Sequence, residues 1–415
     1  MRFIPVDKLR DAFEEVGQEI EIARDIIYMS HKGLRMRFAS KGIKVLHRHL
    51  QKLESLGIDL LAIKDPILDG VRFDFIIDED SRIALKFMLD DFAKTVETIL
   101  DKFFKDKPRA GIGHEFRDYW RWHCNMTIAQ TGRYKKNIQD LIYIIRSNFR
   151  VKHLPLMPFP YNMTNYLSLH SINVALLAGN IAIRLGDFNS ERLMHLVAGA
   201  VLHDAGFPFG LFEGKYGGKD SEVYRKHPRI GCMVINETEG LTSQMGIISL
   251  EHHRYINNTG YPEDIPEKDF YGYPRNMHLY SKIVSIAEHF VSLSMWYPGD
   301  KVIKAMKAFK GELFEPEYID LFENIVLPFS PGQEVMLSDG RKAIVVGVNK
   351  KALERPVVRI LRDENGKRPK DIIEVALAKE GLSISCPAYV DKRLKDFLQP
   401  LYDKDLLAKL EEGGV

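Results

Sequence analysis

The sequence predicts a mainly α-helical protein whose helical core is flanked by a small N-terminal α/β module and a small C-terminal β module. Between Tyr161 and Leu327, apolar residues recur at helical spacing, with loops at 205–222 and 256–275. The first 70 residues instead combine short strand-like runs with one amphipathic stretch, and short alternating segments follow Pro328. These three patterns give the order of the parts along the chain.

The N-terminal module, residues 1–70, is expected to contain strands around a turn at His31–Gly33 and a helix that Gly57 ends. Its predicted elements are the strands Ile22–Met29 and Leu34–Ala39, the helix Ile43–Leu56 and the strand Leu60–Ile63. Residues 71–155 are predicted to form a helical linker region. Its predicted elements are the helices Asp80–Phe104 and Asn137–Phe149, with a charged linker, Asp106–His114, between them.

Residues 156–327 are predicted to form the main helical domain, 328–389 the β module and 390–415 a C-terminal helix from about Lys392 to Leu410. The turn around Gly340 is flanked by alternating apolar residues and predicts a hairpin. The predicted strands of the β module are Gln333–Leu337, Ala343–Val348, Val357–Leu361, Ile372–Ala376 and Leu382–Cys386.

Composition excludes several classes of protein. The 59 basic and 57 acidic residues give a net charge of +2, which argues against bulk nucleic-acid binding and a polybasic membrane anchor. Three separated cysteines (Cys124, Cys232, Cys386) make neither a disulfide framework nor a thiolate zinc site. No signal peptide is visible, and apolar runs such as Val174–Leu185 fall short of the roughly 20 residues that span a bilayer. We therefore expect a cytoplasmic protein that binds no DNA and has no membrane span.

Histidines and carboxylates recur where the predicted helices face the core. His170 shares one helix face with Leu167 and Val174, in steps of three and four. His203 reaches the inner face near a helix end, next to Asp204. The other such residues are His227 at a helix start, His252 and His253 at a helix end, and Glu288 within an apolar helix.

Taken alone, each position has an ordinary structural interpretation. A histidine on an apolar stripe, such as His170, is more often a hydrogen-bonded core residue, and His227 could face solvent. Glu288 needs a partner, because a lone buried charge is costly. Together, imidazoles and carboxylates without thiolate suit Fe(II), Mn(II) or Zn(II). We therefore predict a pocket holding two divalent metal ions, an arrangement that activates a bridging water for in-line attack on phosphorus.

Given these residues, the segment 160–300 resembles the HD-GYP family of HD-domain metal-dependent phosphohydrolases, which hydrolyse cyclic di-GMP in bacteria. The motif Gly260-Tyr261-Pro262 begins eight residues after His252. The resemblance implies an HD-type helical bundle, two divalent ions (Fe or Mn) as cofactors, and Asp204 and His203 as catalytic residues, with Asp204 bridging. The implied ligands are His170, His203, Asp204, His227, His252, His253 and Glu288, and the implied substrate contacts are Phe207, Arg254, Tyr261 and Pro262.

The chain departs from the family pattern near the phosphate. Phe207 replaces the lysine of the HDxGK motif, so a cation that helps to stabilise the developing charge is missing. Lys215, Lys219 or Arg254 could supply that charge. Phe207 itself could stack on a guanine base, or it could be a hydrophobic anchor for its loop, which is the interpretation we favour.

Other departures bear on metal number and substrate contacts. Tyr166 stands where members with three metals have a glutamate, which favours two metals. Arg254, Asn257 and Asn258 replace Glu, Asp and Gly, and Met295–Pro298 replaces an Arg-Pro-Tyr-Arg segment. A second Gly-Tyr-Pro, at 272–274, is interpreted as coincidence.

Three functions are therefore open. The chain could be an active phosphodiesterase for cyclic di-GMP, as the complete set of ligand positions favours. It could be a catalytically impaired nucleotide sensor or interaction scaffold, as the altered residues favour, with protein partners bound by the flanking modules. It could also hydrolyse another phosphoester, because the resemblance fixes metal chemistry better than substrate.

Overall fold

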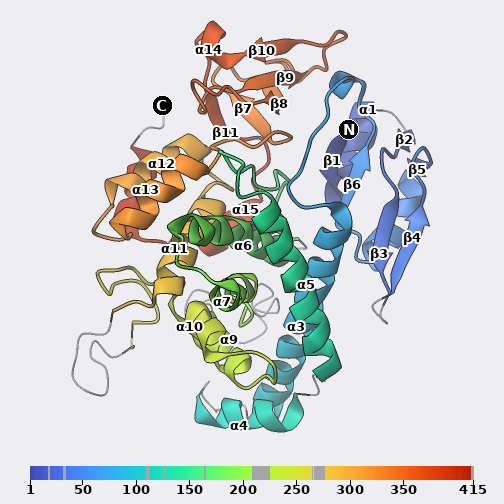
Figure 1. Cartoon of the computed structure of the whole chain (residues 1–415). Helices are drawn as coiled ribbons and strands as arrows, with labels where there is room; N and C mark the ends of the chain where they lie inside the picture. The colour runs from blue at the N-terminus through green and yellow to red at the C-terminus, as the bar shows by residue number, and fades with distance from the viewer. Residues whose placement is uncertain are drawn as a thin grey trace.

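The computed structural model confirms a mainly α-helical protein with small strand modules near both ends (Figure 1). The structure describes residues 1–16, 19–30, 34–107, 113–124, 128–162, 165–207, 225–263, 265 and 276–412. The predicted turn at His31–Gly33 and the second Gly-Tyr-Pro lie outside the described residues.

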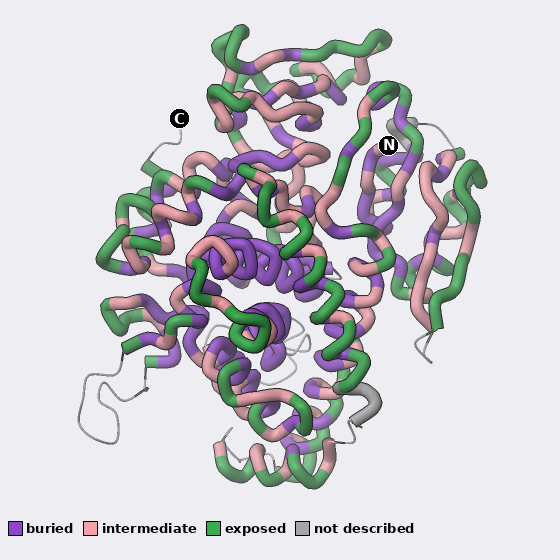
Figure 2. The backbone as a smooth tube through the Cα atoms, in the orientation of Figure 1, coloured by how far each residue is buried: buried purple, intermediate pink, exposed green. Residues whose placement is uncertain are grey.

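Helix α6 (Tyr166–Leu185) lies at the centre of the helical core, where it packs on α7 (Ser190–Val201) and α11 (Leu279–Leu293). Figure 2 shows α6 and the C-terminal half of α7 as buried segments in the middle of the molecule. Gly186 ends α6 in the left-handed conformation, and the Asn189 side chain caps α7. The other core helices are α9 (His227–Asn236), α10 (Ser243–Glu251), α12 (Gly299–Ala308) and α13 (Pro316–Ile325).

Helix α6 is longer than the apolar run that the sequence analysis considered. Among the described residues it is the one helix long and apolar enough to cross a membrane, with 20 residues. However, 94% of its apolar window is buried inside the protein. Its hydrophobic side chains are therefore covered by neighbouring helices, as in the core of a globular domain. The cytoplasmic location stays a prediction.

The N-terminal module consists of three two-stranded antiparallel pairs, β1 with β6, β2 with β5 and β3 with β4. The predicted helix Ile43–Leu56 is wrong in its first half, because Lys44–Leu46 pairs with β2, and the α-helix begins only at Leu50. The elements are β1 (Arg2–Pro5), η1 (Val6–Lys8), α1 (Leu9–Val16), β2 (Glu19–Glu21), β3 (Ile26–Met29), β4 (Arg35–Ala39), β5 (Lys44–Leu46), η2 (His47–His49), α2 (Leu50–Ser55), β6 (Leu60–Ile63) and η3 (Pro66–Leu68).

Three helices connect this module to the core: α3 (Glu79–Asp106), α4 (His114–His123) and α5 (Ile128–Ser147). Helix α3 confirms the predicted long helix and packs on both α5 and α6. Helix α5 begins nine residues before its predicted start. Helix α4, which we did not predict, is anchored by two fully buried aromatic side chains, Phe116 and Trp120, in an otherwise charged segment.

The C-terminal β module is a five-stranded antiparallel sheet with the order β10-β9-β8-β7-β11. All five predicted strands are present, including the hairpin of β7 and β8. Arg2 of β1 makes an ion pair with Glu334 of β7, so the module is attached to the N-terminal strands. The elements are β7 (Glu334–Leu337), β8 (Lys342–Gly347), β9 (Val357–Arg362), β10 (Glu374–Ala376), α14 (Leu377–Glu380) and β11 (Ile384–Pro387).

The C-terminal helix is broken, unlike the continuous helix that we predicted. It consists of α15 (Lys392–Leu398), η5 (Gln399–Leu401) and α16 (Lys404–Glu411). Pro400 lacks an N–H donor and disfavours a helical conformation before it, and Asp403 starts α16 by capping it. Helix α16 packs on α12. The segment therefore returns to the helical core after the β module.

Candidate metal centre

The predicted histidines converge although they come from four separate helices. His170 lies on α6, His203 and Asp204 follow α7, His227 begins α9, and His252 and His253 follow α10. Their ligand atoms form two groups, each lying within 4.8 Å. The first group is His170, His203 and Asp204, and the second is Asp204, His227, His252 and His253. Asp204 belongs to both.

The carboxylate of Asp204 lies between two pairs of imidazoles. Its Oδ2 atom is 3.4 Å from His203 Nε2 and 3.7 Å from His170 Nε2. Its Oδ1 atom is 3.3 Å from His227 Nε2 and 3.4 Å from His252 Nε2. Asp204 therefore lies between the two imidazole pairs, with one oxygen facing each pair, and its role as a bridging ligand stays a prediction.

Backbone carbonyls orient the imidazoles. His203 Nδ1 lies 2.7 Å from the Ala200 carbonyl, and His252 Nδ1 lies 2.7 Å from the Ser249 carbonyl. Because a carbonyl only accepts, these contacts assign the proton to Nδ1 and leave a lone pair on Nε2. Ser249 also donates from Oγ to the His203 carbonyl at 2.6 Å, which links the ends of α7 and α10. Such outer contacts orient the ligands of metal sites.

The imidazoles within each pair face each other through Nε2. The Nε2–Nε2 distance is 3.1 Å for His170 and His203, and 3.1 Å for His227 and His252. Two lone pairs at this distance repel unless a proton or a cation lies between them. Two nitrogens that each lie about 2.1 Å from one cation are 3.1 Å apart when the angle between the two nitrogen–cation bonds is roughly 95°. The donor set therefore fits one divalent ion at each pair.

Burial sets the protonation of the site. It lowers the pKa of His170 to about 3 and that of His203 to about 4, so both imidazoles are neutral at pH 7. Burial opposes ionisation of Asp204, but His203, His227 and His252 outweigh it and hold its pKa well below the usual value. The site thus presents the neutral imidazoles of His170 and His203 beside one carboxylate anion, which is the form of these groups that binds metal.

Gly206 allows the His203–Asp204 turn to pack against the start of α9. A Cβ atom at this position would lie 2.1 Å from the His227 carbonyl oxygen and 2.2 Å from the Gly231 nitrogen. Any side chain would therefore push α9 away from the turn. The glycine of this motif is needed for the close approach that brings His227 to Asp204.

Glu288 is buried but lies outside both groups of ligand atoms. Its Oε1 atom accepts hydrogen bonds from Tyr402 at 2.6 Å and from Ser292 at 2.9 Å. Burial raises its pKa to about 8, so the carboxyl is mainly protonated at pH 7. Its role as a metal ligand stays a prediction, and the hydrogen bonds of this structure hold it in an outer position.

Tyr402 and Tyr255, which we did not predict, close the site on the side of the C-terminal segment. The Tyr402 ring lies 6.0 Å from that of His253, between centroids. Tyr255 contacts His289 Nε2 at 2.9 Å and accepts the Asp403 backbone N–H at 3.2 Å. No local pattern marks Tyr402; the break at Pro400 was the available signal.

The predicted substrate contacts are mostly covered. Phe207 is fully buried and packs against Tyr166 and Phe397, which supports its role as an anchor and leaves no ring face for a base. Arg254 is also buried, 4.0 Å from Glu251 and hydrogen-bonded to Asn258. Lys215 and Lys219 lie outside the described residues.

Tyr261 and Pro262 are also buried, and the Tyr261 ring stacks on His253 with centroids 4.5 Å apart. Arg225, which the sequence analysis did not consider, lies over the Tyr261 ring at 5.3 Å, and its side chain is 42% exposed. It is therefore a solvent-accessible cation beside the histidines.

Two family models match the chain. The HD domain model matches residues 167–292, and the model of a KOW domain associated with HD domains matches residues 334–382. The first match contains every predicted metal ligand, from His170 to Glu288. The second lies within the β module.

Two bacterial relatives are similar to parts of the chain. The cyclic di-GMP phosphodiesterase response regulator RpfG of Xanthomonas campestris is 28% identical over 156 residues, which are 35% of this chain and 39% of that protein. A cyclic di-GMP phosphodiesterase of Pseudomonas aeruginosa is 22% identical over 227 residues, or 52% of this chain and 53% of that protein. The chain thus spans 39% and 53% of the lengths of these two relatives. No solved structure matches it significantly.

These findings confirm the resemblance to HD-GYP proteins that the histidine pattern indicated, and the HD-type helical core. The part of the chain that holds the two imidazole pairs matches the HD domain model.

Proposed function

We propose that this protein is a metal-dependent phosphodiesterase that hydrolyses a cyclic dinucleotide, with cyclic di-GMP as its substrate. The observation that carries the proposal is the pair of imidazole sets that share Asp204, one on each carboxylate oxygen. The similarity to two cyclic di-GMP phosphodiesterases supports the choice of substrate.

His170 and His203 would hold one ion, and His227, His252 and His253 the other, with Asp204 between them. Two divalent ions, when bound, acidify a water for in-line attack and neutralise charge on the phosphate. The protein contributes the neutral imidazoles of His203 and His252, whose orientation is fixed by hydrogen bonds to the Ala200 and Ser249 carbonyls. It also excludes bulk water, because the site is buried, and this strengthens every electrostatic contact within it.

A cation for the substrate phosphate has to come from a position other than that of Phe207. Arg225 is the best candidate among the described residues, because it lies over Tyr261 and next to the start of α9 while remaining partly exposed. Its ion pair with Glu263 is also partly exposed and is therefore easily exchanged. We propose that Arg225 binds the phosphate and that the Tyr261 ring orients the Arg225 side chain.

The second candidate function is a non-catalytic nucleotide sensor or interaction scaffold. Two observations favour it: Phe207 in place of a lysine is buried, and Glu288 is hydrogen-bonded to Tyr402 of the C-terminal segment. A protein with this function would keep the metal site as a structural element and would bind nucleotide without cleaving it.

A chromatographic assay separates these functions. Protein purified anaerobically and supplied with Mn(II) or Fe(II) should convert cyclic di-GMP to the linear dinucleotide or mononucleotides, and His203→Ala should abolish turnover. His195→Ala, on helix α7 two turns before His203 and outside the site, is the matched control and should retain activity. Stoichiometric metal with nucleotide binding and no turnover would support the sensor. Absence of both metal and nucleotide binding would contradict both functions.

A further inference from the structure

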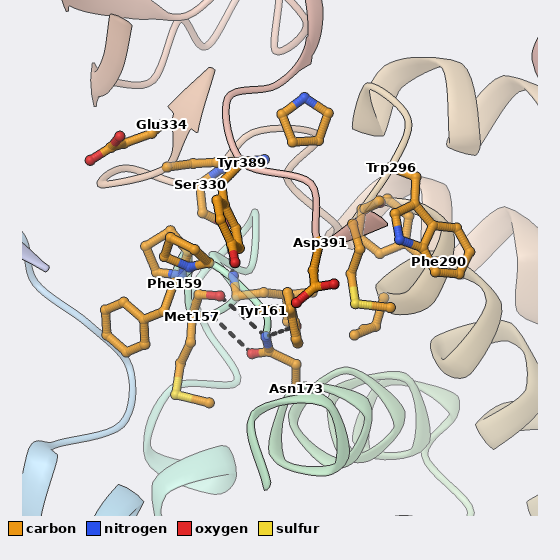
Figure 3. A pocket seen from close by; sticks show the side chains of 18 of the residues that line it. Met157, Phe159, Tyr161, Asn173, Phe290, Trp296, Ser330, Glu334, Tyr389 and Asp391 are labelled. Atoms are coloured by element: carbon orange, nitrogen blue, oxygen red, sulfur yellow. Dashed lines mark hydrogen bonds between the residues drawn. The ribbon is translucent and has the colours of Figure 1, made fainter. Parts of the chain in front are cut away.

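A second cavity lies where the helical core, the β module and the C-terminal segment meet (Figure 3). Asn173 lines it from α6, one turn beyond His170, and Phe290 and Ser294 line it from α11 and its end. Ser330 contributes from the connection to β7, and Asp391 from the start of α15. The cavity uses none of the candidate metal ligands.

The walls of this cavity are largely aromatic. Phe159, Tyr161, Phe290, Trp296 and Tyr389 all line it, with methionines and prolines between them. Its volume is about 80 Å³. At about 12 Å³ for each water position, this is space for roughly six or seven waters. The cavity therefore suits a ligand of about ten non-hydrogen atoms or fewer, far smaller than a dinucleotide.

Charge also excludes a phosphate ligand. No Lys, Arg or His occurs among the described residues that line the cavity, whereas two carboxylates, Glu334 and Asp391, do. Glu334 is neutralised by Arg2 and Lys342. Asp391 makes no ion pair within the described part of the chain; its Oδ1 caps α15 by accepting the N–H groups of Arg393 and Leu394.

The Asp391 carboxylate points into the cavity, near Tyr161 (Figure 3). Burial raises the pKa of Tyr389 above its usual value, and the charges of Asp7, Asp391 and Asp11 add to this effect. Lys8 Nζ lies 5.2 Å from the centre of the Tyr389 ring, but Lys8 does not line the cavity.

One hydroxyl in the cavity lacks a partner. Ser294 Oγ is buried and makes no hydrogen bond within the described structure. Asn173, in contrast, is fully used: its amide contacts both the N–H and the carbonyl of Met157 and donates to the Tyr161 hydroxyl. Among the polar groups on the wall, Asp391 therefore offers an acceptor with negative charge, and Ser294 offers a hydroxyl.

We propose that this cavity is a binding site for a small organic cation, an amine carried on an aromatic or short alkyl body. The ammonium would donate to Asp391 and lie against aromatic rings, which attract cations, while the apolar body fills the space between Phe290 and Trp296. The cavity excludes anions of the same shape, because nothing along it would neutralise their charge. This site is separate from the HD site and does not depend on the function proposed for it.

Calorimetric titration with three probes of similar size tests the proposal on the full-length protein. The probes are 2-phenylethylamine, which is cationic, 2-phenylethanol, which is neutral, and phenylacetate, which is anionic. We expect saturable binding of 2-phenylethylamine with a Kd of about 1 mM or tighter. We expect the affinity for phenylacetate to be lower by about tenfold or more, as for loss of a charge-assisted hydrogen bond.

Asp391→Asn is the decisive variant, because asparagine caps a helix as well as aspartate and removes only the charge. It should weaken 2-phenylethylamine binding by about tenfold and leave the affinity for 2-phenylethanol nearly unchanged. Asp396→Asn, an exposed position on the same helix, makes the same charge change outside the cavity and should have no effect. The proposal is overturned if 2-phenylethylamine does not bind saturably, if phenylacetate binds equally well, or if Asp391→Asn binds like the wild type.

Discussion

Asp204→Asn tests the shared carboxylate with almost no change in side-chain volume. In the structure, Oδ2 faces His170 and His203, and Oδ1 faces His227 and His252, at 3.3 to 3.7 Å. An asparagine keeps one oxygen, so it can serve one imidazole pair. It presents an amide NH₂ to the other pair and removes the negative charge from both.

The Asp204→Asn variant should bind both ions much more weakly than the wild type. Removing an outer partner of a metal ligand already costs roughly 10–100-fold in metal affinity. A carboxylate that contacts both imidazole pairs should matter more, so we expect the affinity for each ion to fall by at least about 100-fold. Turnover should fall by about 10³-fold or more, as for deletion of a principal electrostatic contact.

Competition with a chelator of known affinity measures this effect, in parallel with chromatographic detection of hydrolysis. Asp187→Asn, at an exposed position after α6, is the control and should behave like the wild type. Circular dichroism should show an intact fold for both variants, since the amide can still hydrogen-bond to the imidazoles. If Asp204→Asn retained both ions with affinities within about threefold of the wild type, the shared-carboxylate arrangement would be refuted.

Three further predictions concern stability and pH. In metal-free protein, the folded-state pKa of Glu288 is raised from 4.5 to about 8, so its contribution to stability is complete below pH 4.5 and is lost as the pH rises through 8. Between roughly pH 6 and 9, the free energy of unfolding measured with urea should decrease by about 3 kcal/mol more for the wild type than for Glu288→Gln. If the free energy of unfolding changed equally with pH in both proteins, this would argue against the burial of the Glu288 carboxyl. Gly206→Ala should lose metal and about 3 kcal/mol of stability, because its Cβ would meet the His227 carbonyl; a wild-type Tm and metal content would contradict this. Phe207→Ala should lower the free energy of unfolding, measured by heat or urea, by about 3–5 kcal/mol, because the ring is buried. A small decrease would indicate that the ring lies at the surface.

Helical periodicity was sufficient to place the main histidines. His170 and His203 were predicted on inward faces because apolar residues flank them in steps of three and four, and both are fully buried. The sequence could not show that Asp204 offers one oxygen to each imidazole pair, since this depends on how four helices pack. It also could not show the hydrogen bond from Tyr402 to Glu288, because the two residues are 114 positions apart.

The fold was predicted correctly for elements with a regular repeat of apolar residues. It was predicted wrongly where pairing with a distant segment determines the secondary structure. Helix α3 and the strands of the β module have strong local patterns and were predicted well. The segment Lys44–Leu46 has a helix-like apolar pattern, but its backbone pairs with β2. Helix α4 was missed because it buries few apolar side chains, chiefly Phe116 and Trp120, which give a weak periodic pattern.

The most direct test of the two-metal account is an anomalous diffraction experiment on crystals of anaerobically prepared protein, with data collected at the absorption edge of the bound metal. The account predicts two anomalous peaks, one beside His170 and His203 and the other beside His227 and His252, with Asp204 between them. A map with no peak within bonding distance of these imidazoles, from protein that is folded and kept from chelators, would contradict it.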